Sequence, residues 1–276
     1  ESMIKHAGVN FWCRSTSRQI VTPWANTAES RNDLRRKGAQ LVTHATETKE
    51  MRPHVADIAT PYQFMGAAWA NTRPYVMNVW SCGSGKTLGA IMAALGRPGD
   101  VVVVCPAKAR HVWWSQVQEY TNITPFRVKP QAETRKKDKT FSQYVDECAE
   151  TGQRKFVIVG AESIADNVGI IRGIAPEILI LDEIHTHGNS KRWTAIHNVD
   201  GSVRFEKRKT SASKNPNSQV NRHARAVAMM EVSRISSINL RLGLTATPLD
   251  DGRPRRLWSQ LDLLAPGGFS HSYSNF

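Results

Sequence analysis

The chain has 276 residues, of which 40% are hydrophobic, enough to fill the core of a globular protein. Its 37 Lys and Arg exceed its 24 Asp and Glu, which gives a formal net charge of +13 and favours a polyanionic partner, most simply nucleic acid, over a merely solubilising surface. No apolar run approaches the ~20 residues of a membrane span and no signal peptide opens the chain, so we expect no membrane partner and a location in the cytoplasm, nucleoid or nucleus. The four cysteines lack CxxC spacing, and we expect reduced thiols rather than zinc ligands or disulfides.

Two regions are expected along the chain. Residues 1–52 carry no catalytic pattern and are expected to form an accessory region, with a charged surface helix over residues 28–38. Residues 53–276 are expected to form one large α/β domain. The chain begins at Glu1 rather than Met, and we therefore expect it to be part of a longer protein.

An apolar helix is expected from Phe64 to Trp69, opened by Thr60-Pro61-Tyr62-Gln63. Taken alone, Gln63 would be an ordinary residue of a helix start. Its place upstream of the glycine-rich turn described next favours contact with adenine, because a glutamine amide offers a donor and an acceptor to the two-sided edge of that base.

The next stretch has the order that a nucleoside triphosphate site needs: a short buried strand over Val76–Trp80, the turn Gly83-Ser84-Gly85-Lys86-Thr87, and a helix over Leu88–Leu95. Glycines let the backbone N–H groups of such a turn face phosphates, and the helix N-terminus adds a partial positive charge. The lysine reaches the β- and γ-phosphates, and the threonine hydroxyl is a ligand for Mg²⁺. The strict pattern has a glycine where this chain has Trp80, so only its second half matches.

Two further buried strands are predicted from the apolar runs over Asp100–Pro106 and Arg154–Gly160, because such runs fit parallel strands that are covered on both faces. A helix over Ala107–Tyr120 is expected after the first of them. Lys108 and Arg110 follow the end of that strand, where open α/β sheets bind ligands, and could hold a nucleic-acid phosphate.

A further apolar run, starting at Ile178, ends in the adjacent carboxylates Asp182 and Glu183. A carboxylate at a strand end beside a phosphate-binding turn can hold the water shell of Mg²⁺, and its neighbour can polarise the attacking water. Two more strand–helix units fit between Lys86 and Asp182, which lets both residues reach one edge of a sheet.

Residues 186–213 interrupt the alternation of strands and helices and are interpreted as a basic insertion, either a loop or a hairpin. Lys191 and Arg192 lie there among aromatic residues, which favours nucleic-acid contact and a solvated loop about equally. After it, Asn239–Pro248 is predicted to be a strand that runs into a hydroxyl-rich turn. A helix over Arg253–Leu264 is expected to follow.

Read together, these segments occur in the order found in superfamily 2 helicases and resemble the glutamine motif and motifs I, Ia, II and III of that family. The group they resemble most is the Swi/Snf-type translocases of double-stranded DNA. The resemblance implies an N-terminal RecA-like motor domain, an α/β P-loop fold with a mostly parallel central sheet flanked by helices. It covers about residues 60–270 and is carried by Gln63, Gly83–Thr87, Val103–Ala107, Asp182–His185, Lys214–Ser218, Leu244–Pro248 and Leu257–Leu261.

The resemblance also implies an ATPase that uses ATP and Mg²⁺ to move on duplex DNA. Lys86 and Thr87 would bind phosphate and Mg²⁺, and Asp182 would hold the same ion. Glu183 would position the hydrolytic water.

His185, with Thr245 and Thr247, would link the state of the nucleotide to the nucleic-acid surface. Two residues depart from the family's pattern. Trp80 replaces an acidic or small residue at the outer edge of the turn. Ile184 replaces the commoner alanine, which keeps an RNA helicase among the alternatives.

Motors of this family have a second RecA-like domain that carries an arginine finger, and the sequence shows no counterpart after Phe276. Because such an arginine accelerates phosphoryl transfer greatly, we expect this chain alone to bind ATP weakly and to hydrolyse it slowly or not at all. Two alternatives stay open. One is the motor of a restriction or repair complex, or an RNA helicase. The other is a nucleic-acid-binding module with a vestigial nucleotide pocket.

Overall fold

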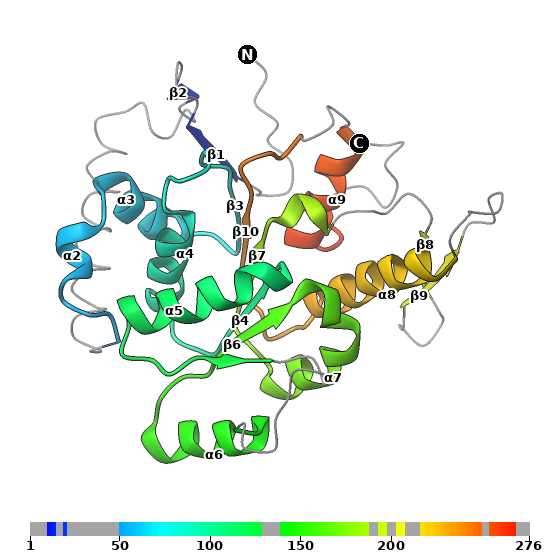
Figure 1. The fold of residues 1–276 in the computed structure, drawn as a ribbon. Coiled ribbons are helices and arrows are strands. Elements are labelled where there is room, and N and C mark those ends of the chain that lie inside the picture. The colour runs from blue at the N-terminus through cyan, green and yellow to red at the C-terminus, as the bar shows by residue number, and fades with distance from the viewer. Residues whose placement is uncertain are drawn as a thin grey trace.

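The computed structural model describes residues 10–14, 19–20, 50–128, 139–187, 193–197, 203–207, 216–249 and 254–268. Its centre is an eight-stranded sheet in the order β2-β1-β3-β10-β7-β4-β6-β5 (Figure 1). Of its described pairs, only β1 with β2 is antiparallel. The α/β fold with a mostly parallel sheet is thereby confirmed. The strands are β1 (Asn10–Arg14), β2 (Gln19–Ile20), β3 (Tyr75–Asn78), β4 (Val101–Cys105), β5 (Phe126–Arg127), β6 (Phe156–Gly160), β7 (Ile178–Asp182) and β10 (Leu240–Leu244).

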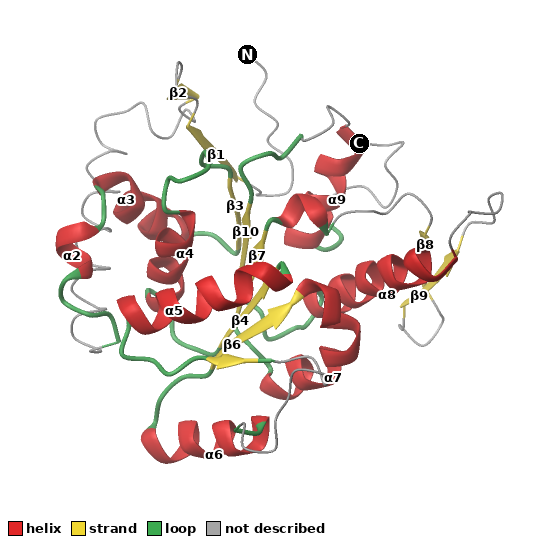
Figure 2. Cartoon of the chain, viewed as in Figure 1, coloured by secondary structure: helices red, strands yellow, loops and turns green. Residues whose placement is uncertain are grey.

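Helices cover both faces of this sheet (Figures 1 and 2). One face carries α3 (Pro61–Ala70), α4 (Lys86–Leu95) and α5 (Arg110–Tyr120). The other carries α7 (Ile164–Ile174), α8 (Pro216–Ser233) and α9 (Pro254–Leu264). Two further helices in the described ranges are α2 (Val55–Ile58) and α6 (Phe141–Thr151). In the part of the chain that the structure describes, no helix combines the length and the apolar character needed to cross a membrane.

The core consists of two apolar layers, one on each side of the sheet. In β4, Val101 and Val103 face the layer under α3, α4 and α5, whereas Val102 and Val104 face the opposite layer. All four valines are fully buried. A strand covered on both faces needs an unbroken apolar run, which is why the sequence of β4 does not alternate.

The N-terminal region contributes a strand to the same sheet. β1 pairs in parallel with β3, so this strand extends the sheet beyond the expected domain. Near residue 52, the Glu50 carboxylate holds the Arg154 guanidinium through two contacts of 2.7 Å. The boundary between residues 52 and 53 stays a prediction, and the helix expected over 28–38 lies outside the described residues.

Several elements differ in detail from the sequence prediction. β3 ends at Asn78 rather than Trp80, because the backbone N–H of Trp80 bonds to Asn78 Oδ1 at 3.0 Å. The helix expected from Ala107 begins with a single 3₁₀ turn over Ala107–Ala109. Helix α8 was not predicted from the sequence. In the region expected to be an insertion, β8 (Trp193–His197) and β9 (Val203–Lys207) pair antiparallel, so this part is a hairpin.

Candidate functional site

Three segments of the predicted site leave one edge of the sheet together because their strands are neighbours. β10 lies between β3 and β7, and Leu244 pairs with Asn78 on one side and with Asp182 on the other. The glycine-rich turn after β3, the carboxylates after β7 and the threonines after β10 therefore start from adjacent positions. This is the carboxyl edge of a parallel sheet, where α/β proteins bind ligands.

The glycine-rich turn has a left-handed backbone at two of its glycines. The φ angle is 72° at Gly83 and 75° at Gly85, a region that strains residues with a side chain. Gly85 is the N-cap of α4, so Lys86 and Thr87 open that helix, both partly exposed. The first N–H groups of a helix lack partners within it and form a natural anion site.

Tyr62 and Gln63 of α3 hold this turn by its carbonyl groups. Tyr62 Oη donates to Ser84 O at 2.6 Å. Gln63 Nε2 donates to Ser84 O at 3.3 Å and to Gly85 O at 3.2 Å. At the other end of the amide, Gln63 Oε1 accepts from the backbone N–H and the hydroxyl of Thr60. Gln63 is buried, and it would have to give up part of this set of bonds to contact adenine.

Lys86 lies against the same turn. Its Nζ donates to Trp80 O at 3.1 Å and to Ser81 O at 3.0 Å. Neutral carbonyls are weaker partners for an ammonium group than charged phosphate oxygens, so a bound phosphate can replace them.

Trp80, at the glycine position of the strict phosphate-loop pattern, is a packing residue. It is buried, and its ring meets that of Tyr62 edge to face with centroids 5.0 Å apart. A Cβ atom built on Gly89 of α4 would lie 2.9 Å from Trp80 Cζ3. The fold therefore makes room for the indole by leaving Gly89 without a side chain.

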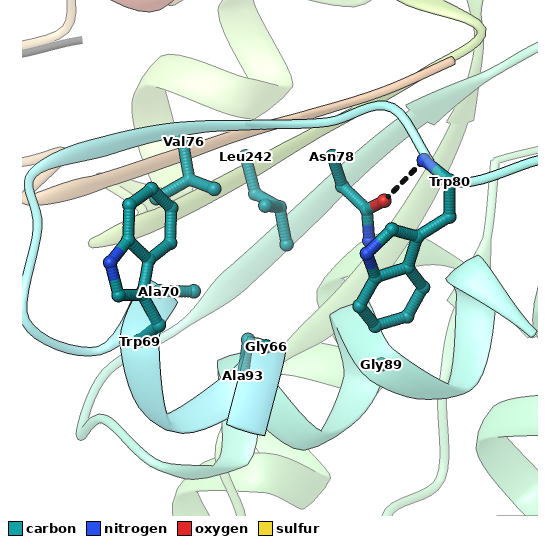
Figure 3. A pocket seen from close by; sticks show the side chains of 9 residues that line it. All are labelled: Gly66, Trp69, Ala70, Val76, Asn78, Trp80, Gly89, Ala93 and Leu242. Atoms are coloured by element: carbon teal, nitrogen blue, oxygen red, sulfur yellow. Dashed lines mark hydrogen bonds between the residues drawn. The ribbon is translucent and has the colours of Figure 1, made fainter. Parts of the chain in front are cut away.

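A small cavity lies beside Trp80, between α3, α4, β3 and β10 (Figure 3). Its volume is about 10 Å³, close to the space of a single water molecule. It is too small for a nucleobase. The cavity is lined by Gly66, Trp69, Ala70, Val76, Asn78, Trp80, Gly89, Ala93 and Leu242.

Asp182 ends β7, and two donors hold its carboxylate. Trp113 Nε1 of α5 donates to Oδ2 at 2.8 Å, and the backbone N–H of Glu183 donates to Oδ1 at 3.0 Å. Burial raises the pKa of Asp182, while the bond from Trp113 acts in the opposite direction. A carboxylate oxygen has two lone pairs, so each keeps capacity for a metal ion or its water.

Glu183 has a left-handed backbone, with φ 50° and ψ 47°, although it carries a side chain. Its Oε2 lies 3.2 Å from His185 Nδ1, and the bond to His185 lowers the pKa of Glu183. His185 Nδ1 also lies 2.8 Å from Thr245 Oγ1, which accepts from the backbone N–H of Thr247 at 3.0 Å. Hydrogen bonds thus connect Glu183 through His185 to Thr245 and Thr247, the three residues after Glu183 in this series being those expected to link the state of the nucleotide to the nucleic-acid surface.

Ile184, the second departure from the family's pattern, is fully buried. A Cβ atom built on Gly243 of β10 would lie 2.8 Å from Ile184 Cδ1. As with Trp80 and Gly89, a glycine on the neighbouring element leaves the space that the larger side chain fills.

His187 is a residue of this turn that the sequence analysis missed. It is buried, and its Nε2 donates to the carbonyl oxygen of Asp182 at 2.9 Å. Burial lowers the pKa of His187 to about 4, so its ring is neutral near pH 7. The bond closes the turn from Asp182 to His187. The sequence offers no signal for it beyond a second histidine close to the carboxylates.

The expected nucleic-acid contacts separate into three cases. Lys108 is exposed in the 3₁₀ turn after β4. Arg110 requires a correction, because it is only 8% exposed and its guanidinium donates to the carbonyls of Val128 and Ala107 at 3.0 and 3.3 Å. The structure therefore does not present Arg110 to a phosphate. Residues 191 and 192 lie outside the described part of the chain.

Asp182 and Thr87 are the residues that could hold Mg²⁺. Among the described residues, no group of three or more His, Cys, Asp and Glu side chains could hold a metal ion. Mg²⁺ commonly keeps several waters and binds through one or two carboxylates together with phosphate oxygens. The residues present therefore fit Mg²⁺ that arrives with a nucleotide, and they do not fit a metal site built by protein alone.

Comparison with known proteins gave matches in solved structures. No model of a protein family matches the sequence, and neither does any curated protein. One similar structure is the Sulfolobus solfataricus SWI2/SNF2 ATPase core in complex with dsDNA, with 16% identity and a TM-score of 0.49 over 78% of this chain and 37% of that one. Another is the Pyrococcus furiosus Hef helicase domain, with 16% identity and a TM-score of 0.49 over 78% of this chain and 38% of that one. The chain thus spans less than two fifths of the length of each.

Proposed function

We propose that this chain is an ATP-binding motor domain of superfamily 2 that couples ATP hydrolysis to movement on duplex DNA. The observation that carries the proposal is the position of β10, whose Leu244 pairs with both Asn78 and Asp182. Through this pairing the phosphate-binding turn, the carboxylates and Thr245 share one edge of the sheet. The order of these motifs in the sequence supports the same proposal.

In the proposed mechanism, Lys86 exchanges its bonds to Trp80 O and Ser81 O for bonds to the β- and γ-phosphates. The N-terminus of α4 contributes its N–H groups to the same anion. Thr87 and Asp182 would hold Mg²⁺, which when bound neutralises charge on the phosphates and so favours phosphoryl transfer. Gln63 remains the candidate adenine contact, once it releases the turn.

Glu183 would orient the attacking water. The bond to His185 keeps the Glu183 carboxylate ionised and in place, so it can accept a hydrogen bond from that water. His185 also contacts Thr245. A movement of Glu183 on hydrolysis would therefore shift His185 and, through it, Thr245 at the end of β10. We also propose that fast hydrolysis needs an arginine from a second domain of the same type, in the same or a partner chain.

Duplex DNA is the proposed partner because the chain has a net charge of +13 and Lys108 is exposed near the same edge of the sheet. The test measures binding of a fluorescent ATP analogue and of duplex DNA by three proteins: the wild type, Lys86→Ala and Lys108→Ala. We expect Lys86→Ala to lose nucleotide binding by at least tenfold and to keep its DNA binding. The matched variant Lys108→Ala should show the reverse pattern.

Wild-type nucleotide affinity in Lys86→Ala would contradict the proposal. ATPase stimulation by duplex DNA, single-stranded DNA and RNA separates a duplex translocase from an RNA helicase. If the wild type binds DNA equally with and without nucleotide and shows no nucleotide binding, the chain is a nucleic-acid-binding module with a vestigial pocket.

A further inference from the structure

A tryptophan outside the recognised motifs contacts the carboxylate that is proposed to hold Mg²⁺. Trp113 lies in the first turn of α5, and its indole N–H donates to Asp182 Oδ2 at 2.8 Å. Trp113 is 1% exposed, so the bond is shielded from solvent on the side of the ring.

The surroundings of the indole explain why this bond forms. Trp113 belongs to the apolar layer between the sheet and α3, α4 and α5, in the same buried cluster as Val103 and Val117. An indole N–H that is buried in such a layer needs an acceptor, and the Asp182 carboxylate is the acceptor that it has. A bond from N–H to a charged oxygen is stronger than one between neutral groups.

The same bond fixes the orientation of the carboxylate. Asp182 has one oxygen held by Trp113 and the other by the N–H of Glu183. With both oxygens held, the carboxylate plane cannot rotate freely, and the remaining lone pairs keep constant directions. A group that orients a metal ligand in this way typically changes metal affinity by about 10- to 100-fold when it is removed.

We propose that Trp113 is the positioning residue of Asp182 and that it sets the Mg²⁺ affinity of the nucleotide site from helix α5. This inference rests on the proposed function, since it assumes that Asp182 serves Mg²⁺ beside a nucleotide. It adds an element, α5, to the glycine-rich turn over Gly83–Thr87 and to the acidic turn over residues 182–187.

The neighbouring residue offers a matched control. Trp114 is partly buried against the same apolar layer, and its ring centroid lies 6.1 Å from that of His111. Trp113→Phe removes the N–H and keeps most of the aromatic packing, and Trp114→Phe makes the same chemical change one residue away. A role limited to packing would affect both variants through stability, whereas a role in positioning affects the first through Mg²⁺.

The first measurement is binding of a fluorescent ATP analogue as a function of Mg²⁺ concentration. We expect Trp113→Phe to raise the Mg²⁺ concentration for half-maximal binding by about tenfold or more, with unchanged binding in EDTA. Trp114→Phe should follow the wild-type curve. A wild-type Mg²⁺ dependence in folded Trp113→Phe, or an equal shift in both variants, would overturn the inference while the proposed function stands.

A second measurement uses the wild type and Asp182→Asn and requires no substitution of Trp113. The protein has eight tryptophans, and their indole N–H groups give separate signals in a ¹H–¹⁵N spectrum of wild-type protein. We expect one signal to move in Asp182→Asn and the same signal to move when Mg²⁺ and a non-hydrolysable ATP analogue are added together. If no indole signal responds to both changes, Trp113 does not sense the ligand of Asp182. If the wild type binds no nucleotide at all, the proposed function fails and the inference fails with it.

Discussion

The turn proposed to bind phosphate (residues 81–87) and the acidic turn (residues 182–187) lie at the same edge of the sheet, but they are held in place differently. Hydrogen bonds from Tyr62, Gln63 and Lys86 reach carbonyl oxygens of the first turn, which is largely exposed. The acidic turn is held by buried groups, Trp113 and His187, which donate to the carboxylate and the carbonyl of Asp182.

The backbone conformations of the two turns show what this difference means. In the first turn, positive φ angles fall on Gly83 and Gly85, which adopt them without steric strain. In the second, the positive φ falls on Glu183, whose side chain makes the conformation unfavourable. A strained residue persists only when its surroundings over-determine it. The acidic turn is therefore the rigid half of the site, and the phosphate-binding turn is the half that can adapt to a ligand.

The largest expected effect concerns Trp80, the buried residue that precedes the exposed glycine-rich turn. Trp80→Ala should destabilise the protein by about 3–5 kcal/mol, because it removes a buried indole that α4 is shaped to hold. Urea denaturation measures the loss. Cys82→Ser, at an exposed position of the same turn, is the control and should stay within about 0.5 kcal/mol of the wild type. A loss below that of the control would show that the indole contributes nothing to the fold.

The next effect concerns pH and the buried side of the acidic turn. The pKa of His187 is lowered to about 4 in the folded protein, so between pH 6.5 and 4 the unfolded chain binds a proton that the folded protein does not. Stability is therefore lost as pH falls through this window, by on the order of 3 kcal/mol from this group.

Denaturation curves between pH 7 and 4 measure this loss for the wild type and for His187→Gln. The variant has no ring to protonate, and its pH dependence should be flatter by that amount. His111→Gln, at an exposed position on α5, is the control and should leave the profile as it is. A steep profile that persists in His187→Gln would assign the pH dependence to other groups.

The positive φ angles predict opposite effects of glycine and alanine on stability in the two turns, each of about 1 kcal/mol. Glu183→Gly should be more stable than Glu183→Ala by about 1 kcal/mol, because glycine accepts the positive φ. Gly83→Ala should be less stable than the wild type by a similar amount, about 1 kcal/mol, although a Cβ there meets nothing within 4 Å. Thermal unfolding of the four proteins gives both differences. An Ala variant at 183 that equals the Gly variant would mean that the turn relaxes on losing its carboxylate.

The smallest expected effect is at the adaptable turn. Tyr62→Phe removes the hydroxyl bond to Ser84 O and should cost at most about 1 kcal/mol of stability, since other bonds continue to hold the turn. Nucleotide affinity should change by less than in Lys86→Ala. A larger destabilisation than that of Gly83→Ala would show that the turn is held as rigidly as the acidic one.

The main chain of this site could be predicted from the sequence, because apolar runs and motif order are local signals. The valine run of β4 predicts a strand buried on both faces, and glycines beside Lys86 predict a turn before a helix. The resemblance implied a shared coupling role for His185, Thr245 and Thr247, and the structure places the side chains of His185 and Thr245 in contact. Their role in coupling stays a prediction.

What the sequence did not disclose are pairings set by tertiary packing. Three such contacts are the hydrogen bond from Trp113 to Asp182, the bond from His187 to the Asp182 carbonyl and the bond from the buried Arg110 to Val128. The two residues of each contact are not separated by a helical or strand repeat, so no sequence pattern predicts them. Gly89 and Gly243, which leave space for Trp80 and Ile184, are also matched to their neighbours by tertiary packing alone. In each case the partner lies on another element, so neither member of the pair shows its role in the sequence around it.

The position of β10 also has a consequence for the order in which the protein is made. During synthesis a domain generally folds as a unit, once its elements have emerged from the ribosome. β3 and β7 are synthesised well before β10, yet in the finished sheet they are joined through it. A nascent chain that has not reached Leu240 holds the phosphate-binding turn and the carboxylates on strands that have no common neighbour. The proposed nucleotide site would therefore be completed late in biosynthesis, once β10 has joined the central sheet.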